Sequence, residues 1–123
     1  MKKVFTMLLC FVTIVSICGC KSSNDKAVKE SIKVGITMYN EFDPFTEDIR
    51  HNIEEYLIEY QTRYGVEIST SVVYSGKNQL LQNDQVQDFI DKDYDVICVN
   101  LVDRTDPSVI IEAAKAADKP IIF

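Results

Sequence analysis

A regular alternation of two hydrophobic periods between residues 31 and 123 constrains the fold of this chain more than any other feature. Short β-branched runs are separated by longer stretches in which apolar residues recur every three or four positions, as they do in helices. Strands that alternate with helices favour a parallel sheet with right-handed crossovers and helices on both faces. The sequence therefore predicts an α/β fold, an open doubly wound parallel sheet with the element order β-α-β-α-β-α-β.

The same pattern predicts where each element begins and ends. The predicted strands cover residues 31–38, 66–74, 94–101 and 120–123. The predicted helices cover residues 44–64, 78–91 and 107–117. Gly65 is a natural stop for the first helix, and Asp106 is the expected N-cap of the third, with Pro107 at its first position. We expect the spatial strand order 2-1-3-4, as in open doubly wound sheets.

Residues 1–20 have the three parts of a lipoprotein signal peptide. Lys2 and Lys3 form a positive start, and residues 4–17 form an apolar run that is short for a bilayer span. The ending Ile17-Cys18-Gly19-Cys20 resembles a lipobox, in which the last Cys receives diacylglycerol. We expect lipidation at Cys20, with residues 21–30 as a polar tether. The protein is then exported and lipid-anchored to the outer face of the cell membrane, or on the periplasmic side. An uncleaved membrane anchor is the alternative.

The charge and cysteine content exclude several partners and reactions. The chain has 13 basic and 19 acidic residues, a net charge of −6 that falls to −8 without Lys2 and Lys3. A surface of that sign repels phosphate backbones, so we expect no nucleic-acid partner. Cys98 is the one cysteine expected in the folded part, which excludes an intramolecular disulfide there. Its apolar surroundings indicate a small hydrophobic residue rather than a catalytic thiol.

Motifs of catalysis and of cofactor binding are absent from the sequence. The chain has four glycines in all, with no Gly-rich turn after the first predicted strand and no phosphate-binding loop. His51, the only histidine, lies inside the first predicted helix without histidine or cysteine partners, which indicates a helix-surface residue. We therefore predict no enzyme activity, no cofactor and no metal site.

Polar and aromatic side chains follow the first and third predicted strands. Tyr39, Asp43 and Phe45 follow the first strand, and Asn100 and Asp103 follow the apolar part of the third. Ligands of doubly wound sheets bind at the carboxyl ends of such strands. Carboxylates and amides form hydrogen bonds with hydroxyl groups, and an aromatic ring stacks on the C–H side of a sugar. These loops are therefore the candidate site, and a neutral polyol is the ligand that suits them.

Five segments carry a resemblance to a known family. They are residues 34–39, Asp43-x-Phe45, residues 82–85 (QNDQ), residues 97–103 (ICVNLVD) and residues 119–123. In this order and spacing they resemble the galactose/glucose branch of the periplasmic type I binding-protein family. The resemblance implies a substrate-binding component of an ABC transporter for galactose or glucose. Its implied partners are the sugar, the transporter permease and, in some members, a chemoreceptor.

The resemblance also implies roles for single residues. Asp43 would accept a hydrogen bond from a sugar hydroxyl, Phe45 would stack on the ring, and Asn100 would bond another hydroxyl. Each has a simpler alternative: a helix N-cap for Asp43, a core residue for Phe45, and backbone capping at a strand end for Asn100. Tyr39 and Asp103 are further candidates for the cleft, with packing and a solvated loop as their alternatives.

The resemblance runs from about Ile32 to the last residue. We therefore expect residues 31–123 to form part of the N-terminal lobe of a two-lobed protein. We expect sugar binding that is weak or lost, with the second lobe and the calcium loop of relatives in the missing part. A second hypothesis is a small membrane-anchored interaction module with no sugar binding. A third, an enzyme of flavodoxin-like or receiver-like architecture, is disfavoured by the missing phosphate loop and by export.

Overall fold

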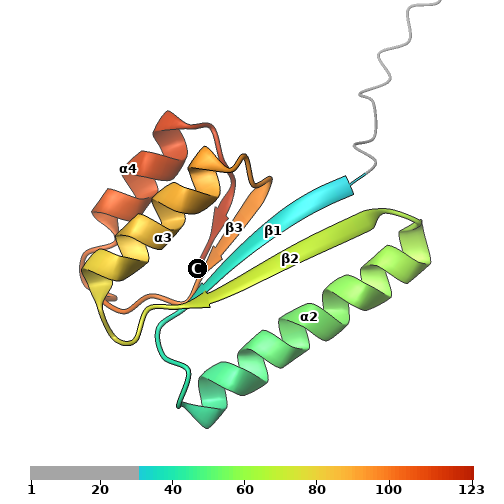
Figure 1. Ribbon diagram of the computed structural model, residues 1–123, viewed down its shortest axis with the longest axis horizontal. Helices are drawn as coiled ribbons and strands as arrows, with labels where there is room; N and C mark the ends of the chain where they lie inside the picture. The colour runs from blue at the N-terminus through green and yellow to red at the C-terminus, as the bar shows by residue number, and fades with distance from the viewer. Residues whose placement is uncertain (1–30) are drawn as a thin grey trace, which may run out of the picture.

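A four-stranded parallel sheet is the centre of the computed structural model, which describes residues 31–123 (Figure 1). Its strands are β1 (Ser31–Met38), β2 (Glu67–Tyr74), β3 (Val96–Val99) and β4 (Ile121–Ile122). They lie in the order β2-β1-β3-β4, and every neighbouring pair is parallel. The predicted fold class and strand order are confirmed. The predictions for the signal peptide, for Cys20 and for the tether fall outside the described residues.

Helices cover both faces of the sheet (Figure 1). Helix α2 (Pro44–Tyr64) lies on one face, and α3 (Gln79–Asp91) and α4 (Ser108–Ala116) lie on the other. Gly65 ends α2 as predicted, in the left-handed conformation with φ of 67°, and its N–H bonds the Gln61 carbonyl. No helix among residues 31–123 is long and apolar enough to cross a membrane.

Several predicted boundaries were wrong by one residue, and those of the third strand were wrong by two at each end. Strand β3 has four residues rather than eight. It begins only at Val96, and at its other end the chain leaves the sheet after the Asn100 N–H has bonded the Thr37 carbonyl at 2.9 Å. Helix α4 begins at Ser108, with Pro107 rather than Asp106 in the N-cap position. The Asp106 carboxylate still accepts bonds from the backbone N–H and the hydroxyl of Ser108, so the predicted capping contact forms although the helix begins one residue later.

The core has two layers, because alternate residues of each strand face opposite sides. Val34, Ile36 and Met38 of β1 pack against one apolar side of α2. On the other face a buried cluster joins β3 to α3 and α4; its members are Val86, Phe89, Ile97, Val99 and Ile110. Burial raises the pKa of the Cys98 thiol on β3, so the thiol stays protonated at neutral pH.

Gly35 of β1 lets α3 approach the sheet closely. A Cβ atom built at Gly35 would lie 2.7 Å from the ring of Phe89, closer than carbon atoms approach each other. Phe89 is itself buried and stacks obliquely on Tyr94, with ring centroids 4.7 Å apart. The ring therefore has little room to move, and the absence of a side chain at Gly35 sets the distance between α3 and β1.

We expect Gly35→Ala to lower the free energy of unfolding by about 1–3 kcal/mol, the usual cost of overpacking a core. Urea denaturation followed by circular dichroism measures it. The control is the same substitution in a Phe89→Leu background, where the smaller side chain makes room for the added methyl group. An equal cost in both backgrounds would show that contact with Phe89 is not the cause.

Candidate functional site

The loops after β1, β2 and β3 meet at one edge of the sheet and are joined by backbone hydrogen bonds. The Ser75 N–H donates to the Met38 carbonyl at 2.8 Å, and the Lys77 N–H donates to the Tyr39 carbonyl at 2.7 Å. The Tyr39 N–H makes a longer bond of 3.4 Å to the side-chain oxygen of Asn100. Because three strands contribute, this edge presents side chains from distant parts of the sequence on one surface.

Asn100 lies where the loops after β1 and β3 touch. Its side-chain oxygen accepts from Tyr39, and its own N–H donates to Thr37. The side chain is half-buried, and its amide nitrogen makes no hydrogen bond to residues 31–123. Asn100 thus caps a backbone group, as its simpler alternative required, and still has a donor to offer a ligand.

Asp43 occupies the N-cap position of α2, yet its carboxylate does not cap the helix. No helix N–H bonds the side chain; one carboxylate oxygen accepts from the Thr46 hydroxyl at 2.7 Å. Thr46 is fully buried, so the carboxylate is held by a fixed neighbour. The half-buried carboxylate of Asp43 can accept a further hydrogen bond from outside.

Phe45 lies on the surface and not in the core. Its side chain is 66% exposed in the first turn of α2, and Phe42 in the preceding loop is 82% exposed. Two exposed aromatic rings therefore flank Asp43. Among residues 31–123, no hydrogen bond joins Asp43 to Asn100; both residues and Phe45 lie in or next to loops at the same end of the sheet.

The side chain of Asp103 forms hydrogen bonds within its own loop. Its carboxylate accepts from the backbone N–H of Thr105 at 2.8 Å and from the Thr105 hydroxyl at 2.6 Å. These bonds, the hydroxyl bond foremost, lower the pKa of Asp103. The side chain is exposed, which fits the solvated-loop alternative.

A buried polar cluster lies beneath the loops, and the sequence reasoning did not identify it as part of the site. The hydroxyls of Thr37 and Ser75 donate to the side-chain oxygen of Gln85 at 2.8 and 2.9 Å. The Gln85 amide nitrogen donates to the Tyr74 carbonyl at 2.9 Å. These bonds attach the ends of β1 and β2 to α3. Glutamines three residues apart, at positions 82 and 85 among apolar residues of one helix, were the signal available in the sequence.

A second group of bonds fixes the first turns of α2, where Asp43 and Phe45 lie. The Tyr74 hydroxyl donates to Glu47 at 2.7 Å, and Arg50 bonds the other Glu47 oxygen at 3.0 Å and also pairs with Glu54. The bond from Tyr74, followed by that from Arg50, lowers the pKa of Glu47. Burial, followed by the bond to Glu47, raises the pKa of Tyr74. The end of β2 thus orients the start of α2.

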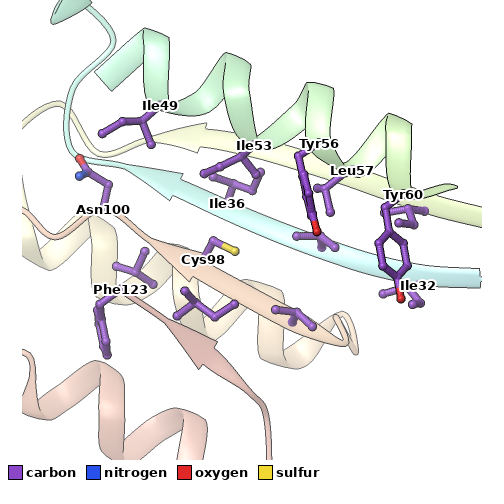
Figure 2. Close-up of a pocket in the computed structure, with 15 residues that line it drawn as sticks. Ile32, Ile36, Ile49, Ile53, Tyr56, Leu57, Tyr60, Cys98, Asn100 and Phe123 are labelled. Carbon is purple, nitrogen blue, oxygen red and sulfur yellow. The ribbon is translucent and has the colours of Figure 1, made fainter. Parts of the chain in front are cut away.

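An apolar groove of about 640 Å³ lies between α2 and the face of β1, β3 and β4 (Figure 2). Figure 2 shows Ile53 and Tyr56 of α2 opposite Ile36 and Cys98, with Asn100 at one end of the groove. Apart from Asn100, its walls offer almost only hydrocarbon, which cannot satisfy the hydroxyl groups of a sugar. The groove is therefore unsuited to a sugar, and the polar loops remain the candidate site.

Within residues 31–123, no group of three or more His, Cys, Asp or Glu side chains is arranged to hold a metal ion. His51 lies on the exposed surface of α2, with its ring nitrogen 3.2 Å from Glu55.

Comparison with known proteins identifies the family. The family model described as the periplasmic binding protein domain matches residues 34–123. The chain therefore belongs to this family, whose members are solute-binding proteins and not enzymes.

Solved structures share the fold. An ABC transporter solute-binding protein from Bacillus halodurans with bound myo-inositol is 23% identical, with a TM-score of 0.65 over 76% of this chain and 31% of its own. A solute-binding protein from Mycobacterium smegmatis with bound glycerol is 22% identical, with a TM-score of 0.61 over 74% of this chain and 30% of its own. A carbohydrate transporter solute-binding protein from Chloroflexus aurantiacus in complex with D-glucose is 22% identical, with a TM-score of 0.56 over 74% and 25%. The chain spans less than a third of the length of each.

We expect Tyr74→Phe to raise the pKa of Glu47 towards its ordinary value of 4.5, because the largest cause of the lowering is removed. A depressed carboxyl pKa stabilises the fold above the unfolded value and loses that effect as the pH falls through the folded value. The variant should therefore lose less stability between neutral and acid pH than the wild type does. Carbon-13 NMR of the Glu47 carboxyl measures the pKa. Tyr64→Phe, at the exposed end of the same helix, is the matched control and should leave the titration unchanged.

Proposed function

We propose that this chain supplies one wall of the binding site of a monosaccharide-binding protein that serves an ABC transporter, with galactose or glucose as the sugar. The loops after β1 and β3 form that wall. Membership of the periplasmic binding protein family supports the proposal. So do the ligands in the structures of similar fold, which include myo-inositol and D-glucose.

The observation that carries the proposal is the exposed ring of Phe45 beside an oriented carboxylate. A large apolar side chain gains little by facing water, and a sugar ring offers it a flat C–H surface. Asp43, held by Thr46, would accept a bond from one hydroxyl. The amide nitrogen of Asn100 would donate to another. A stacking ring with an acceptor and a donor is the combination that a neutral polyol requires.

The charge of the wall favours a neutral ligand over an anionic one. Asp43 contributes a carboxylate, Glu41 precedes it in the same loop, and the whole chain carries −6. An anionic sugar phosphate would be repelled unless a cation paired with it. A neutral monosaccharide meets no such barrier.

One wall leaves the opposite face of the sugar in water. Tight sites of this kind bury most of the ligand, so binding to residues 31–123 should be weak, with a Kd on the order of 1 mM or above. The second wall would come from the remainder of a two-lobed protein, and the transporter permease would be the partner that receives the sugar.

We expect galactose or glucose to shift the NMR signals of Asn100 and Phe45 in a saturable way when it is titrated into the purified chain. Phe45→Ala should weaken binding at least tenfold, because it removes the stacking surface. Phe42→Ala is the matched control, since this neighbouring ring is even more exposed and has no proposed contact with the sugar. Shifts that do not saturate for either sugar would contradict the proposal and favour the interaction module that binds no sugar.

We also propose that the protein is exported and anchored through a lipid on Cys20. The lipobox-like ending at residues 17–20 supports this. In cells fed a labelled fatty acid, the wild type should incorporate label and fractionate with membranes, and Cys20→Ser should do neither. Cys18→Ser is the control, because serine is a usual small residue at that position and should preserve labelling. Label that persists in Cys20→Ser would place the modification elsewhere.

A further inference from the structure

Gln82 of α3 is a fully buried side chain that bonds the loop after β3 at two points. Its amide nitrogen donates to the Asn100 carbonyl at 2.9 Å. Its side-chain oxygen accepts from the Val102 N–H, also at 2.9 Å. The carboxamide thus pairs with the main chain as a neighbouring strand would, donating to one residue and accepting from the next but one.

The loop needs such a partner because it has left the sheet. Strand β3 ends at Val99, and the last bond of the ladder is the one from the Asn100 N–H to the Thr37 carbonyl. Beyond it, the Asn100 carbonyl and the Val102 N–H would be partly buried without strand partners. A polar group left there without a partner would destabilise this conformation of the loop. One glutamine satisfies both.

The consequence concerns Asn100. Its N–H is held by β1, its carbonyl by Gln82, and its side-chain oxygen by Tyr39. These three bonds restrict both the main chain and the side chain of Asn100. They therefore also restrict the direction of its side-chain amide nitrogen. Gln79, one turn earlier on the same side of α3, extends the hold by accepting from the Asp103 N–H at 2.7 Å.

We propose that Gln82 is the positioning residue of the candidate site: it clamps the main chain at Asn100 and Val102 so that the Asn100 amide is presented to the ligand. This inference rests on the proposed sugar-binding function. Gln85 differs in its task, since its bonds go to Thr37, Ser75 and Tyr74 and none reaches the loop after β3.

The test replaces Gln82 with a side chain of similar length that cannot hydrogen-bond. In ligand-free Gln82→Met, the side-chain amide signal of Asn100 should shift, and hydrogen exchange at the Val102 N–H should accelerate about tenfold. Sugar affinity, where it is measurable, should fall about tenfold. Gln85→Met is the matched control: it should lower stability comparably but leave exchange at Val102 unchanged. Equal effects of both variants on Asn100 and Val102 would reduce Gln82 to a general structural role and overturn the proposal.

A measurement on the wild type keeps the proposal testable if Gln82→Met does not fold. The side-chain amide protons of Gln82 should exchange with water at least tenfold more slowly than those of Gln87, which lies on the exposed side of the same helix. Equal exchange rates would show that the clamp does not form. Failure of sugar binding is a separate result: if the wild type binds neither galactose nor glucose, the proposed function fails, while exchange at Val102 still decides whether Gln82 holds this loop.

Discussion

The hydrogen bonds of the Thr37 hydroxyl, buried where β1 ends, are the interaction on which the candidate site depends. Thr37 lies within hydrogen-bond reach of Ser75, Gln85 and Gln82, so the ends of two strands and one helix meet at this hydroxyl. A buried polar group that loses its partner costs about 1–3 kcal/mol, so these bonds hold the ends of β1 and β2 against α3. Among the described residues, no buried side-chain nitrogen or oxygen lacks a partner. This buried cluster therefore holds the loops of the candidate site in place.

The two faces of the sheet are packed by different means. On the face of α3 and α4, the absence of a side chain at Gly35 lets Phe89 lie against β1, and the glutamines reach the strand ends as a result. On the other face, α2 covers part of the sheet and leaves an apolar groove towards β4. On the face of α3 and α4, close packing also excludes water from the polar cluster. The same helix, α3, thus supplies both the apolar contact and the hydrogen bonds that hold the site.

Hydrophobic period predicted the strands, the helices and the spatial order of the sheet, because each depends on which residues must be buried. It also placed Asp43 and Asn100 on one edge, since parallel strands end together. The periodicity did not predict the end of the third strand, where a side chain replaces a neighbouring strand as the hydrogen-bond partner of the main chain. The predicted third strand ran on to residue 101, while a glutamine takes over from the ladder after Asn100. An analysis of hydrophobic periodicity treats the polar residues of a helix as solvent-facing. The sequence analysis therefore named Gln82 only as part of the QNDQ segment and gave it no role in the site.

The open geometry of this wall limits what it can contribute to specificity. Galactose and glucose differ in the orientation of one hydroxyl, and a site rejects the wrong orientation only when that hydroxyl, or the group meant for it, is left unpaired away from water. Asp43 and Phe45 lie at a surface where water can replace a missing bond, so the penalty for a mismatch is small. The amide nitrogen of Asn100 would orient the ligand, but it does not exclude water from the site. In the proposed site, discrimination between the two sugars would therefore arise mostly where a second wall excludes water, while this wall would supply stacking and a preset pair of polar contacts.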